Sequence, residues 1–508
     1  MISSFRLHSI YNPEREAERF IDTAITLESP SFVVVSEPGE SWIAYAVQKK
    51  FPSAIIIALR YSTSYFTDSD SLWNHVWRPN SPISVSSFLF NIIPDEYLSL
   101  TQFISWKPSD SVWPEESSIV WKEISELIRK QHSIMYTRTH FGNRWLKNMF
   151  INCMQMNTII AAEYTNKPVL LAAAGPSLEH LFPFDSSDMY VCAVSSALSC
   201  LEFNNCEPDI CIATDGGYWA LDHFRKISNK IPVCFPLEAA IPSFVLKTNP
   251  LILLNYGSAL ESLLLSRLHI QSEKAERNGT VAGTAAIYAL SHSSSSVFAS
   301  GLDLCPSLDF PHARPHSSES ITFSTSRINA LSGILYERNL SSLSFSIYRN
   351  WFSTQNEHFK NRFFRIKPVP SLLPNITDID KKDIQRFIHI SSDKTFSSKN
   401  FQDNFDLSKR KEILVSILNS LLLECRSFRD ISYFISATNI HVKENKTELC
   451  LATLEFLQMV SYLDYINALK MVRKPLDDNN TITVLDSLCD AGESFITKLI
   501  FIVRSQIC

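Results

Sequence analysis

One stretch constrains the fold more than any other: KPVLLAAAGPSLEHL, residues 167 to 181. Its first part, Val169 to Ala174, is apolar without alternation, which is typical of a central strand in a parallel sheet covered on both faces. Gly175 then permits a tight turn, and Pro176 suits the first position of a helix. The backbone N–H groups from Ser177 onward are expected to point over the strand end, where they favour a phosphate. The alternative is an ordinary strand-to-helix turn that holds no ligand.

Two later segments repeat this order of strand, polar turn and helix. In residues 189 to 217, a strand leads through Ser195 and Ser196 into a short helix, and a second strand, 209–214, ends at Asp215. In residues 278 to 304, Asn278-Gly279-Thr280 opens a helix of small residues, and the strand 297–300 leads to Asp303. Ligands of open α/β sheets bind outside the carboxyl ends of the strands. The sequence therefore predicts that these polar strand ends converge with Gly175, if the strands are neighbours.

These motifs resemble the DUF115 proteins, which include the Maf flagellin glycosyltransferases and the archaeal 6-hydroxymethylpterin diphosphokinases with an MptE-like domain. The matching features span residues 167 to 315: GPSL, the PDI strand that ends in Asp215, NGTVAGTA, and GLDL followed by FPHA at 310–313. The opening LHSIYNPEREAERFI, residues 7 to 21, also resembles the start of Maf-like chains. The resemblance implies a central Rossmann-like, sialyltransferase-like parallel-sheet domain, an N-terminal α/β domain and a C-terminal helical domain.

The resemblance implies transfer of a nonulosonic acid from a CMP-sugar to Ser or Thr of flagellin, with no metal or other cofactor. The catalytic residues would be Asp215, Asp303 and His312, with His316 close enough in sequence to replace His312. A histidine in a loop can also be an ordinary surface residue. The substrate-binding residues would be Gly175, Pro176, Ser177, Ser195, Ser196, Asn278, Gly279 and Thr280. Ser177 and Gly175 would hold the phosphate, and Asn278 to Thr280 would receive the sugar carboxylate. Plain helix caps are the alternative for Ser177, Asp215 and Thr280.

Two other functions remain open. The first is diphosphate transfer from ATP to a pterin alcohol, with Mg²⁺ held by Asp215 and Asp303. The second is an inactive binding protein of the same fold. Ala174 favours it, because bacterial sialyltransferases place Asn before the glycine of this turn, and the plain loop 36–41 favours it too. Chain length favours transfer to a protein, since the pterin enzymes need little more than the middle domain.

The chain divides into three predicted domains. Residues 1–150 form an N-terminal Rossmann-like α/β domain that begins with a helix capped by Asn12, with Pro13 at its first position. Its loop SEPGES, residues 36–41, has one glycine and an acid, which argues against a nucleotide there. Residues 151–375 form the MptE-like glycosyltransferase domain. Residues 376–508 form a polar linker and three helices, over 409–425, 447–472 and 484–503. We expect this helical end to help hold the acceptor protein.

Composition excludes several classes of protein. The 508 residues carry a formal net charge of -5, and no dense Lys/Arg stripe suits nucleic acid. The 11 cysteines are odd in number and include no C-x-x-C pair, so buried reduced thiols are expected rather than disulfides or a metal site. The start MISSFRLHSI lacks the features of a signal peptide, and no apolar run reaches the roughly 18 residues that a membrane span needs. A cytoplasmic protein without membrane insertion is therefore expected.

Overall fold

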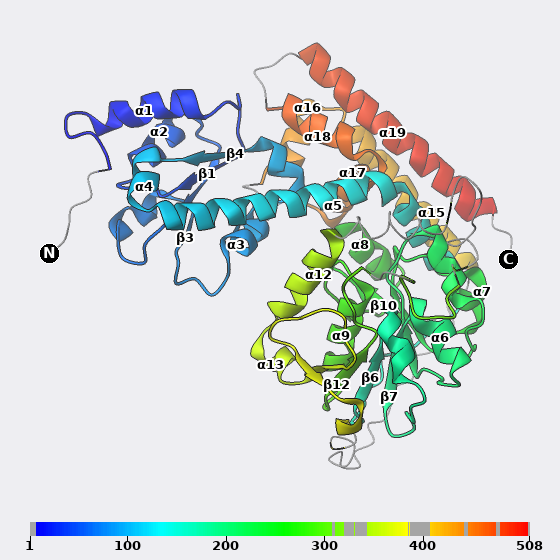
Figure 1. Ribbon diagram of the computed structural model, residues 1–508. Helices are drawn as coiled ribbons and strands as arrows, with labels where there is room; N and C mark the ends of the chain where they lie inside the picture. The colour runs from blue at the N-terminus through cyan, green and yellow to red at the C-terminus, as the bar shows by residue number, and fades with distance from the viewer. Residues whose placement is uncertain are drawn as a thin grey trace. The chain divides into compact units, whose positions relative to one another are not determined.

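The computed structural model describes residues 7–306, 310–317, 319, 330, 343–384, 386, 407–440, 446–473 and 478–505. The chain forms two compact units (Figure 1). The first contains residues 1–142, 425–445 and 457–493, and the second contains residues 143–424, 446–456 and 494–508. The predicted division into three domains stays a prediction, but the C-terminal helices contribute to both units.

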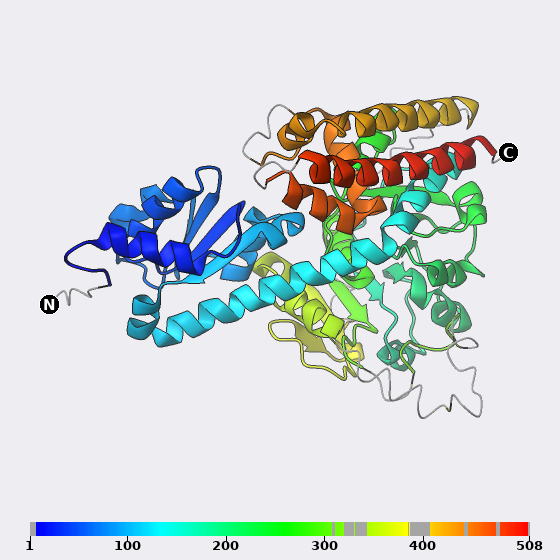
Figure 2. The ribbon, with the colours of Figure 1, turned by 90° about the horizontal axis from the view of Figure 1, so that it is seen from above.

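The first unit is built on a four-stranded parallel sheet in the order β3-β2-β1-β4. The strands are β1 (Phe32–Ser36), β2 (Ile55–Leu59), β3 (His75–Trp77) and β4 (Thr101–Ser105). The helices are α1 (Pro13–Ala24), α2 (Trp42–Lys50), α3 (Val85–Ile92), α4 (Lys107–Val112) and α5 (Pro114–Gln155), with 3₁₀ turns η1 (Thr67–Leu72) and η2 (Asp95–Leu100). The helix α5 is one long element whose last residues belong to the second unit (Figure 2).

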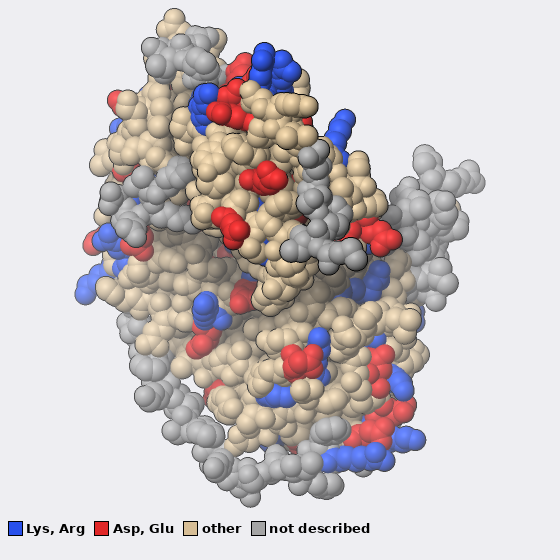
Figure 3. Space-filling view, turned by 90° about the vertical axis from the view of Figure 1, so that its left-hand side faces the viewer, with Lys and Arg blue, Asp and Glu red and all other residues tan. Residues whose placement is uncertain are grey.

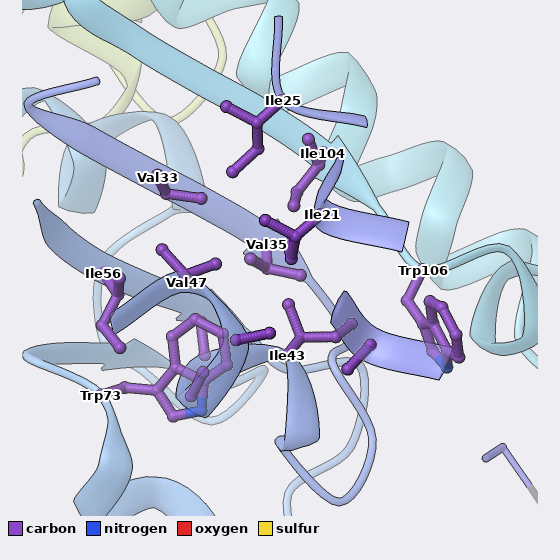
Figure 4. Close-up of a cluster of buried hydrophobic side chains, with 14 of the residues drawn as sticks. Ile21, Ile25, Val33, Val35, Ile43, Val47, Ile56, Trp73, Ile104 and Trp106 are labelled. Atoms are coloured by element: carbon purple, nitrogen blue, oxygen red, sulfur yellow. The ribbon is translucent and has the colours of Figure 1, made fainter. Parts of the chain in front are cut away.

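Apolar side chains from α1, α2 and the sheet make the core of the first unit. Figure 4 shows Ile21 of α1 and Val47 of α2 among the strand residues Val33, Val35 and Ile56. The helix start predicted at Asn12 is confirmed, because the Asn12 side chain accepts a hydrogen bond from the N–H of Arg15 at 2.9 Å. Trp73 and Trp106 are buried core residues, as aromatic residues of such a domain usually are.

The loop 36–41 is filled by a side chain of the protein itself. The buried carboxylate of Glu37 lies 3.0 Å from the guanidinium of Arg60 and also accepts the N–H groups of Tyr61 and Gly39. Arg60 is completely buried and donates further bonds to the Gly39 carbonyl and to Ser41 Oγ. The acid noted in the sequence is therefore a structural partner of Arg60 at the carboxyl end of β1.

The second unit contains a ten-stranded sheet in which every strand pair is parallel. Its order is β11-β10-β9-β8-β7-β6-β12-β13-β14, and β5 also pairs with β10. The strands are β5 (Thr158–Ile159), β6 (Val169–Ala172), β7 (Tyr190–Val194), β8 (Ile210–Ile212), β9 (Val233–Pro236), β10 (Pro250–Asn255), β11 (Glu273–Lys274), β12 (Val297–Ser300), β13 (Phe363–Ile366) and β14 (Thr377–Ile379). The predicted central strand is confirmed, because β6 lies between β7 and β12 and all of its residues are buried.

Short helices connect these strands. They are α6 (Leu198–Phe203), α7 (Ser243–Thr248), α8 (Ala259–Arg267), α9 (Val281–Ser291), α12 (Leu343–Ser353) and α13 (Glu357–Lys360), with the 3₁₀ helices η3 (Pro176–Leu181), η4 (Ser195–Ala197), η5 (Tyr218–Phe224) and η6 (Lys381–Asp383). The helix α9 packs against β6, β7 and β12, and its small residues permit that close packing. The helix α12 lies beside α9 (Figure 1).

The C-terminal part is helical, as predicted. Its helices are α15 (Leu407–Ser427), α16 (Ile431–Ala437), α17 (Glu448–Val460), α18 (Tyr462–Met471) and α19 (Asp478–Ser505). The helices α15 and α19 run alongside one another (Figure 2). Most of the predicted linker, from 387 to 406, lies outside the described residues.

One helix prediction is wrong. The single helix expected over residues 447–472 is two helices, α17 and α18, which are bent by 118° at Ser461. Ser461 has a non-helical backbone and its hydroxyl bonds to Asp464 at 2.5 Å, which is a local arrangement that competes with helix continuation. In the described parts of the chain no single helix is long and apolar enough to cross a membrane, although this bent pair passes that test when its two members are taken together.

Candidate functional site

The GPSL turn at the end of β6 is closed by a carboxylate of the protein. Asp303 Oδ2 accepts the N–H of Ser177 at 2.9 Å, and Asp303 Oδ1 accepts the Ser177 hydroxyl. The N–H of Leu178 donates to the Gly175 carbonyl. The free N–H donors expected at Ser177 and Leu178 are therefore not found, because an acid from the next strand already takes the anion position. The predicted helix is a six-residue 3₁₀ helix, η3, with Pro176 at its start.

Gly175 is required by the packing of two strand ends. A Cβ at this position would lie 2.5 Å from the Gly301 carbonyl oxygen and 2.6 Å from Asp303 Oδ2. Gly301 has a φ of +75°, and the N–H of Gly175 donates to its carbonyl at 2.8 Å. The glycine predicted to approach a phosphate thus approaches the end of β12, just before Asp303.

Asp303 itself is held inside the protein. Only 4% of it is exposed, and burial raises the pKa of its carboxyl group, while the Ser177 bonds lower that pKa. Ser371 donates its hydroxyl to the Asp303 carbonyl, and Arg365 pairs with Asp378 beside it. This is the environment of a structural carboxylate, and the catalytic role of Asp303 stays a prediction.

A histidine lies at the end of the neighbouring strand β7. Ser195, the first residue of η4, is buried, and its Oγ lies 3.2 Å from Nδ1 of His223 in η5. Burial lowers the pKa of His223 to about 4, although the nearby charge of Asp215 opposes that shift. His223 is therefore neutral at pH 7, so its Nδ1 can accept the Ser195 hydroxyl.

Three histidines pack ring to ring in this region, and we call His223, His312 and His316 the histidine cluster. The ring centroids of His223 and His316 are 5.4 Å apart, and those of His312 and His316 are 4.4 Å apart in a stacked pair. Burial, followed by the neighbouring His312 and His223, lowers the pKa of His316 to about 3. The loop that carries two of them is tied to the end of β6, because the N–H of Ala313 donates to the Ala174 carbonyl at 2.9 Å.

Asp215 is exposed beside this cluster. Its Oδ1 accepts the N–H of Gly217 at 2.7 Å, which leaves the carboxylate facing solvent. Its charge raises the pKa of His223 and, after the larger effect of burial, that of Tyr348 in α12. The charge of Asp215 therefore acts on His223 and Tyr348, which come from two other segments.

The Asn278-Gly279-Thr280 turn precedes α9. Asn278 is buried, and its Oδ1 accepts the N–H of Thr280 at 3.2 Å. Thr280 is the N-cap residue of α9, but its side chain makes no capping hydrogen bond. Gly279 has a φ of +83°, and a Cβ there would lie 3.3 Å from the ring of Tyr348. The turn is thus walled on one side by the same tyrosine on which the charge of Asp215 acts.

The fold brings together part of the predicted set. Ser195 and His312 lie beside His223 and His316, the charge of Asp215 acts on His223, and the Asn278–Thr280 turn lies against Tyr348. In contrast, Ser177 bonds to Asp303, and Gly175 packs against Gly301 and Asp303. Ser196 follows Ser195 within η4. The sequence motifs did not indicate His223 or Tyr348. His223 lies eight residues after Asp215, so its position shortly after a strand-ending acid was a usable signal, whereas Tyr348 had none.

Among the residues that the structure describes, no three His, Cys, Asp or Glu side chains are placed to share one metal ion. Figure 3 shows Lys and Arg interspersed with Asp and Glu on the face that it presents. Cys192, Cys200, Cys206, Cys211 and Cys234 are buried free thiols, as expected.

Comparisons with known proteins match the segment that carries Ser195, Asp215, His223 and the Asn278–Thr280 turn, whereas His312, His316 and Tyr348 lie after it. The sequence model described as "6-hydroxymethylpterin diphosphokinase MptE-like" matches residues 143–308. An uncharacterized protein of Treponema pallidum (strain Nichols) is 33% identical over 379 residues, which are 72% of this chain and 85% of that protein.

A solved structure, that of the Maf glycosyltransferase from Magnetospirillum magneticum AMB-1, matches with a TM-score of 0.52. It is 13% identical, and the match covers 98% of this chain and 85% of that chain. At that identity the similarity shows the fold. These findings agree with the motifs: this chain belongs to one family with the Treponema protein, contains an MptE-like domain and has the Maf-like fold.

Proposed function

We propose that this protein is a Maf-like glycosyltransferase that moves a nonulosonic acid from a CMP-sugar to Ser or Thr of flagellin. The observation that carries the proposal is the meeting of Ser195, Asp215 and the histidine cluster at the carboxyl ends of parallel strands. These residues belong to a chain with the Maf-like fold over nearly its whole length. The reaction would take place in the cytoplasm, where flagellin is available before export.

The histidine cluster suits the proton transfer that this reaction needs. The acceptor hydroxyl oxygen forms a bond to the anomeric carbon, the bond from that carbon to the phosphate oxygen breaks, and CMP leaves with the electron pair. The hydroxyl proton passes to a base, for which we propose His312, which is half-buried and stacks on the buried ring of His316. His223 and His316, with pKa values of about 4 and 3, stay neutral, so the cluster can accept that single proton.

The other predicted groups have supporting roles in this proposal. Asp215 would stabilise the protonated base or the positive charge that develops on the sugar ring. Ser195 would position His223, and the Asn278–Thr280 turn would face the donor. We assign Gly175, Pro176, Ser177 and Asp303 to the support of the site, because Ser177 bonds to Asp303, the N–H of Gly175 bonds to the Gly301 carbonyl, and Pro176 begins the turn between them.

A binding survey tests the donor class. CMP or a CMP-nonulosonate should raise the melting temperature without metal, since a ligand at a hundredfold excess over Kd stabilises the native state by about 2.7 kcal/mol. UDP-sugars, and ATP with and without Mg²⁺, are the comparison ligands. Stabilisation by ATP with Mg²⁺ alone would instead support the pterin diphosphokinase, the function that the description of the matching family favours. Stabilisation by no nucleotide would favour the inactive binding protein.

A transfer assay tests the site. Asp215→Asn and His312→Ala should each lower the rate by roughly 10² to 10⁴-fold, the usual contribution of an acid or base, while the melting temperature stays within a few degrees. His132→Ala, which changes an exposed histidine of α5, is the control and should keep the wild-type rate. A wild-type rate in His312→Ala would transfer the role of base to His316 or His223.

A further inference from the structure

The residue before the Asn278-Gly279-Thr280 turn is an arginine held between two aromatic rings. The guanidinium carbon of Arg277 lies 4.9 Å from the ring centroid of Tyr256 and 5.7 Å from that of Trp145. Cation–π contacts of this kind fix the plane of a guanidinium and remove much of its conformational freedom. Arg277 is therefore oriented before any ligand arrives.

A buried carboxylate holds one edge of this guanidinium. Arg277 Nη2 lies 2.5 Å from Glu238 Oε2. The two partners differ in exposure, because the Glu238 side chain is 9% exposed and the Arg277 side chain is 45% exposed. A guanidinium has five N–H donors in a rigid fork, and this one directs a single described bond to Glu238. The ion pair therefore anchors the arginine while the remainder of its donor edge is accessible to a ligand.

Trp145 and Glu238, which contact Arg277, also contact the strand end that carries Asp215. A Cβ on Gly216 would collide with the ring of Trp145 and would lie 2.9 Å from the Glu238 carbonyl oxygen. Asn148 of α5 donates to the carbonyls of both Gly216 and Glu238, at 3.2 and 2.9 Å. These contacts bring the guanidinium to the same edge of the sheet as Asp215, next to the proposed donor site.

The nearby acids leave room for an anion at Arg277. The charge of Glu238 is directed toward the arginine in the ion pair. Glu261, another acid of this region, is buried between the N–H groups of Leu237 and Tyr256, and burial raises its pKa to about 7. Its charge is thus partly neutralised at physiological pH.

We infer that Arg277 binds an oxyanion of the donor, either the sugar carboxylate or the phosphate, through the edge of its guanidinium that faces away from Glu238. The inference rests on the proposed function, whose donor carries both groups. A planar fork suits either anion, because both present two oxygens to a bidentate partner. If the partner is the carboxylate, Arg277 also favours acidic sugars over neutral ones.

Binding of three ligands to Arg277→Gln and Arg277→Lys tests this inference. The ligands are CMP, N-acetylneuraminic acid and CMP-N-acetylneuraminic acid. We expect Arg277→Gln to weaken the binding of CMP-N-acetylneuraminic acid by about 10 to 100-fold, as for loss of a charged hydrogen-bonded pair. Equal weakening of CMP identifies the phosphate as the partner, and unchanged CMP with weakened sugar ligands identifies the carboxylate. Wild-type affinity for all three in Arg277→Gln overturns the inference.

Two variants distinguish the loss of a ligand contact from misfolding of the protein. Arg277→Lys keeps a positive charge beside Glu238 but lacks the fork, and it should fold and bind less tightly. The double variant Glu238→Gln, Arg277→Gln removes the buried charge together with its partner. Arg225→Gln, which removes an exposed arginine paired with Asp222, is the control and should bind as the wild type does.

The proposed function can fail separately from this inference. If the wild type binds no nucleotide, inorganic phosphate and N-acetylneuraminic acid remain as probes of the arginine. Stabilisation of the wild type, but not of Arg277→Gln, by either probe would keep the oxyanion site and reject the CMP-sugar donor. No stabilisation of the wild type by any of these anions would overturn the inference as well.

Discussion

Acidic side chains at strand ends differ in whether they bond to the protein or face solvent. Asp303 and Glu37, each at a strand end, satisfy donors that a ligand would otherwise take, and each is nearly fully buried. Asp215 ends its strand in the same way but stays exposed. An acid after a strand is thus a structural partner where a donor faces it and a candidate ligand group where solvent does.

The buried histidines should make stability depend on pH. His223 and His316 have folded-state pKa values lowered to about 4 and 3, so below about pH 6.5 the unfolded chain binds more protons. Their contribution to stability is complete above about pH 6.5 and is lost as the pH falls toward 4, by up to about 1.4 kcal/mol per pH unit for each. Urea unfolding of wild type and His316→Gln at pH 7.5 and 5 measures this. The wild type should lose about 1 to 2 kcal/mol more than the variant.

The difference between wild type and His316→Gln isolates the contribution of His316 to the pH dependence of stability. Glu261 and Asp303 have raised pKa values and change stability in the opposite direction, but both are present in wild type and variant. Parallel pH profiles for the two proteins would mean that His316 titrates normally and is not buried in solution.

The segments that follow β6 and β12 bond to one another. The turn after β6 is a 3₁₀ helix that begins at Pro176, and the loop after β12 supplies the carboxylate that caps it. The loop 310–317 is tied to the segment after β6, through the Ala174 carbonyl and through Glu179, which accepts the N–H of Arg314. These contacts position His312 and His316 over the end of the sheet.

Substitution of Gly175 tests whether this glycine is needed for packing or for contact with a ligand. Gly175 has a φ of -69°, so Gly175→Ala has no backbone penalty, and its Cβ would meet the Gly301 carbonyl at 2.5 Å. We expect a loss of about 1 to 3 kcal/mol of unfolding free energy, as for overpacking. Thermal and urea unfolding check this.

Gly257→Ala is the matched comparison. Gly257 has a φ of +76° with nothing near its Cβ position, so it should lose only the backbone term, roughly 1 to 2 kcal/mol. Unchanged stability of Gly175→Ala together with loss of nucleotide binding would contradict the packing explanation and restore the phosphate-binding role predicted for Gly175.

Across the whole chain, the C-terminal helices belong to the cores of both units. In the second unit, Arg410 of α15 is buried and donates to the carbonyls of Cys153 and Met156. In the first unit, Tyr462 of α18 donates its hydroxyl to Asp95 at 3.0 Å, and the Tyr97 hydroxyl donates to the Thr438 carbonyl. The helical end is therefore more than an appended surface for a partner.

Removal of residues 407–508 should consequently destroy the fold, since it leaves buried carbonyls without donors and exposes apolar core. The truncated chain is expected to be insoluble or to lack a cooperative thermal transition. A soluble truncated chain with wild-type melting would show that the C-terminal helices are dispensable for folding.

Capture of the acceptor is better tested by surface substitutions. Leu423 of α15 and Phe501 of α19 are 65% and 71% exposed. Leu423→Asp and Phe501→Asp should change stability by less than about 0.5 kcal/mol and reduce co-purification of flagellin if this surface holds it. Ile119→Asp on α5 is the control, at 61% exposure. Equal recovery of flagellin with all three variants would exclude the α15–α19 surface.

Local chemistry made much of the architecture predictable. Apolar runs without alternation mark buried parallel strands, and Gly-Pro and Asn-Gly turns mark where they end, because both depend on residues adjacent in the chain. Hence the central strand β6, the cap at Asn12, the helical end and the polar strand ends were all foreseen. The break at Ser461 was missed, since it has no Pro or Gly to signal it.

The meeting of particular side chains could not be read in this way. Three such pairs are Ser177 with Asp303, Ser195 with His223, and Gly279 with Tyr348. The members of each pair are 28 to 126 residues apart in the sequence. Their contact depends on strand order and on how each loop folds back over the strand ends. A carboxylate at a strand end is the same residue in the sequence whether it caps a neighbouring turn or faces solvent, and only tertiary packing decides which donors reach it.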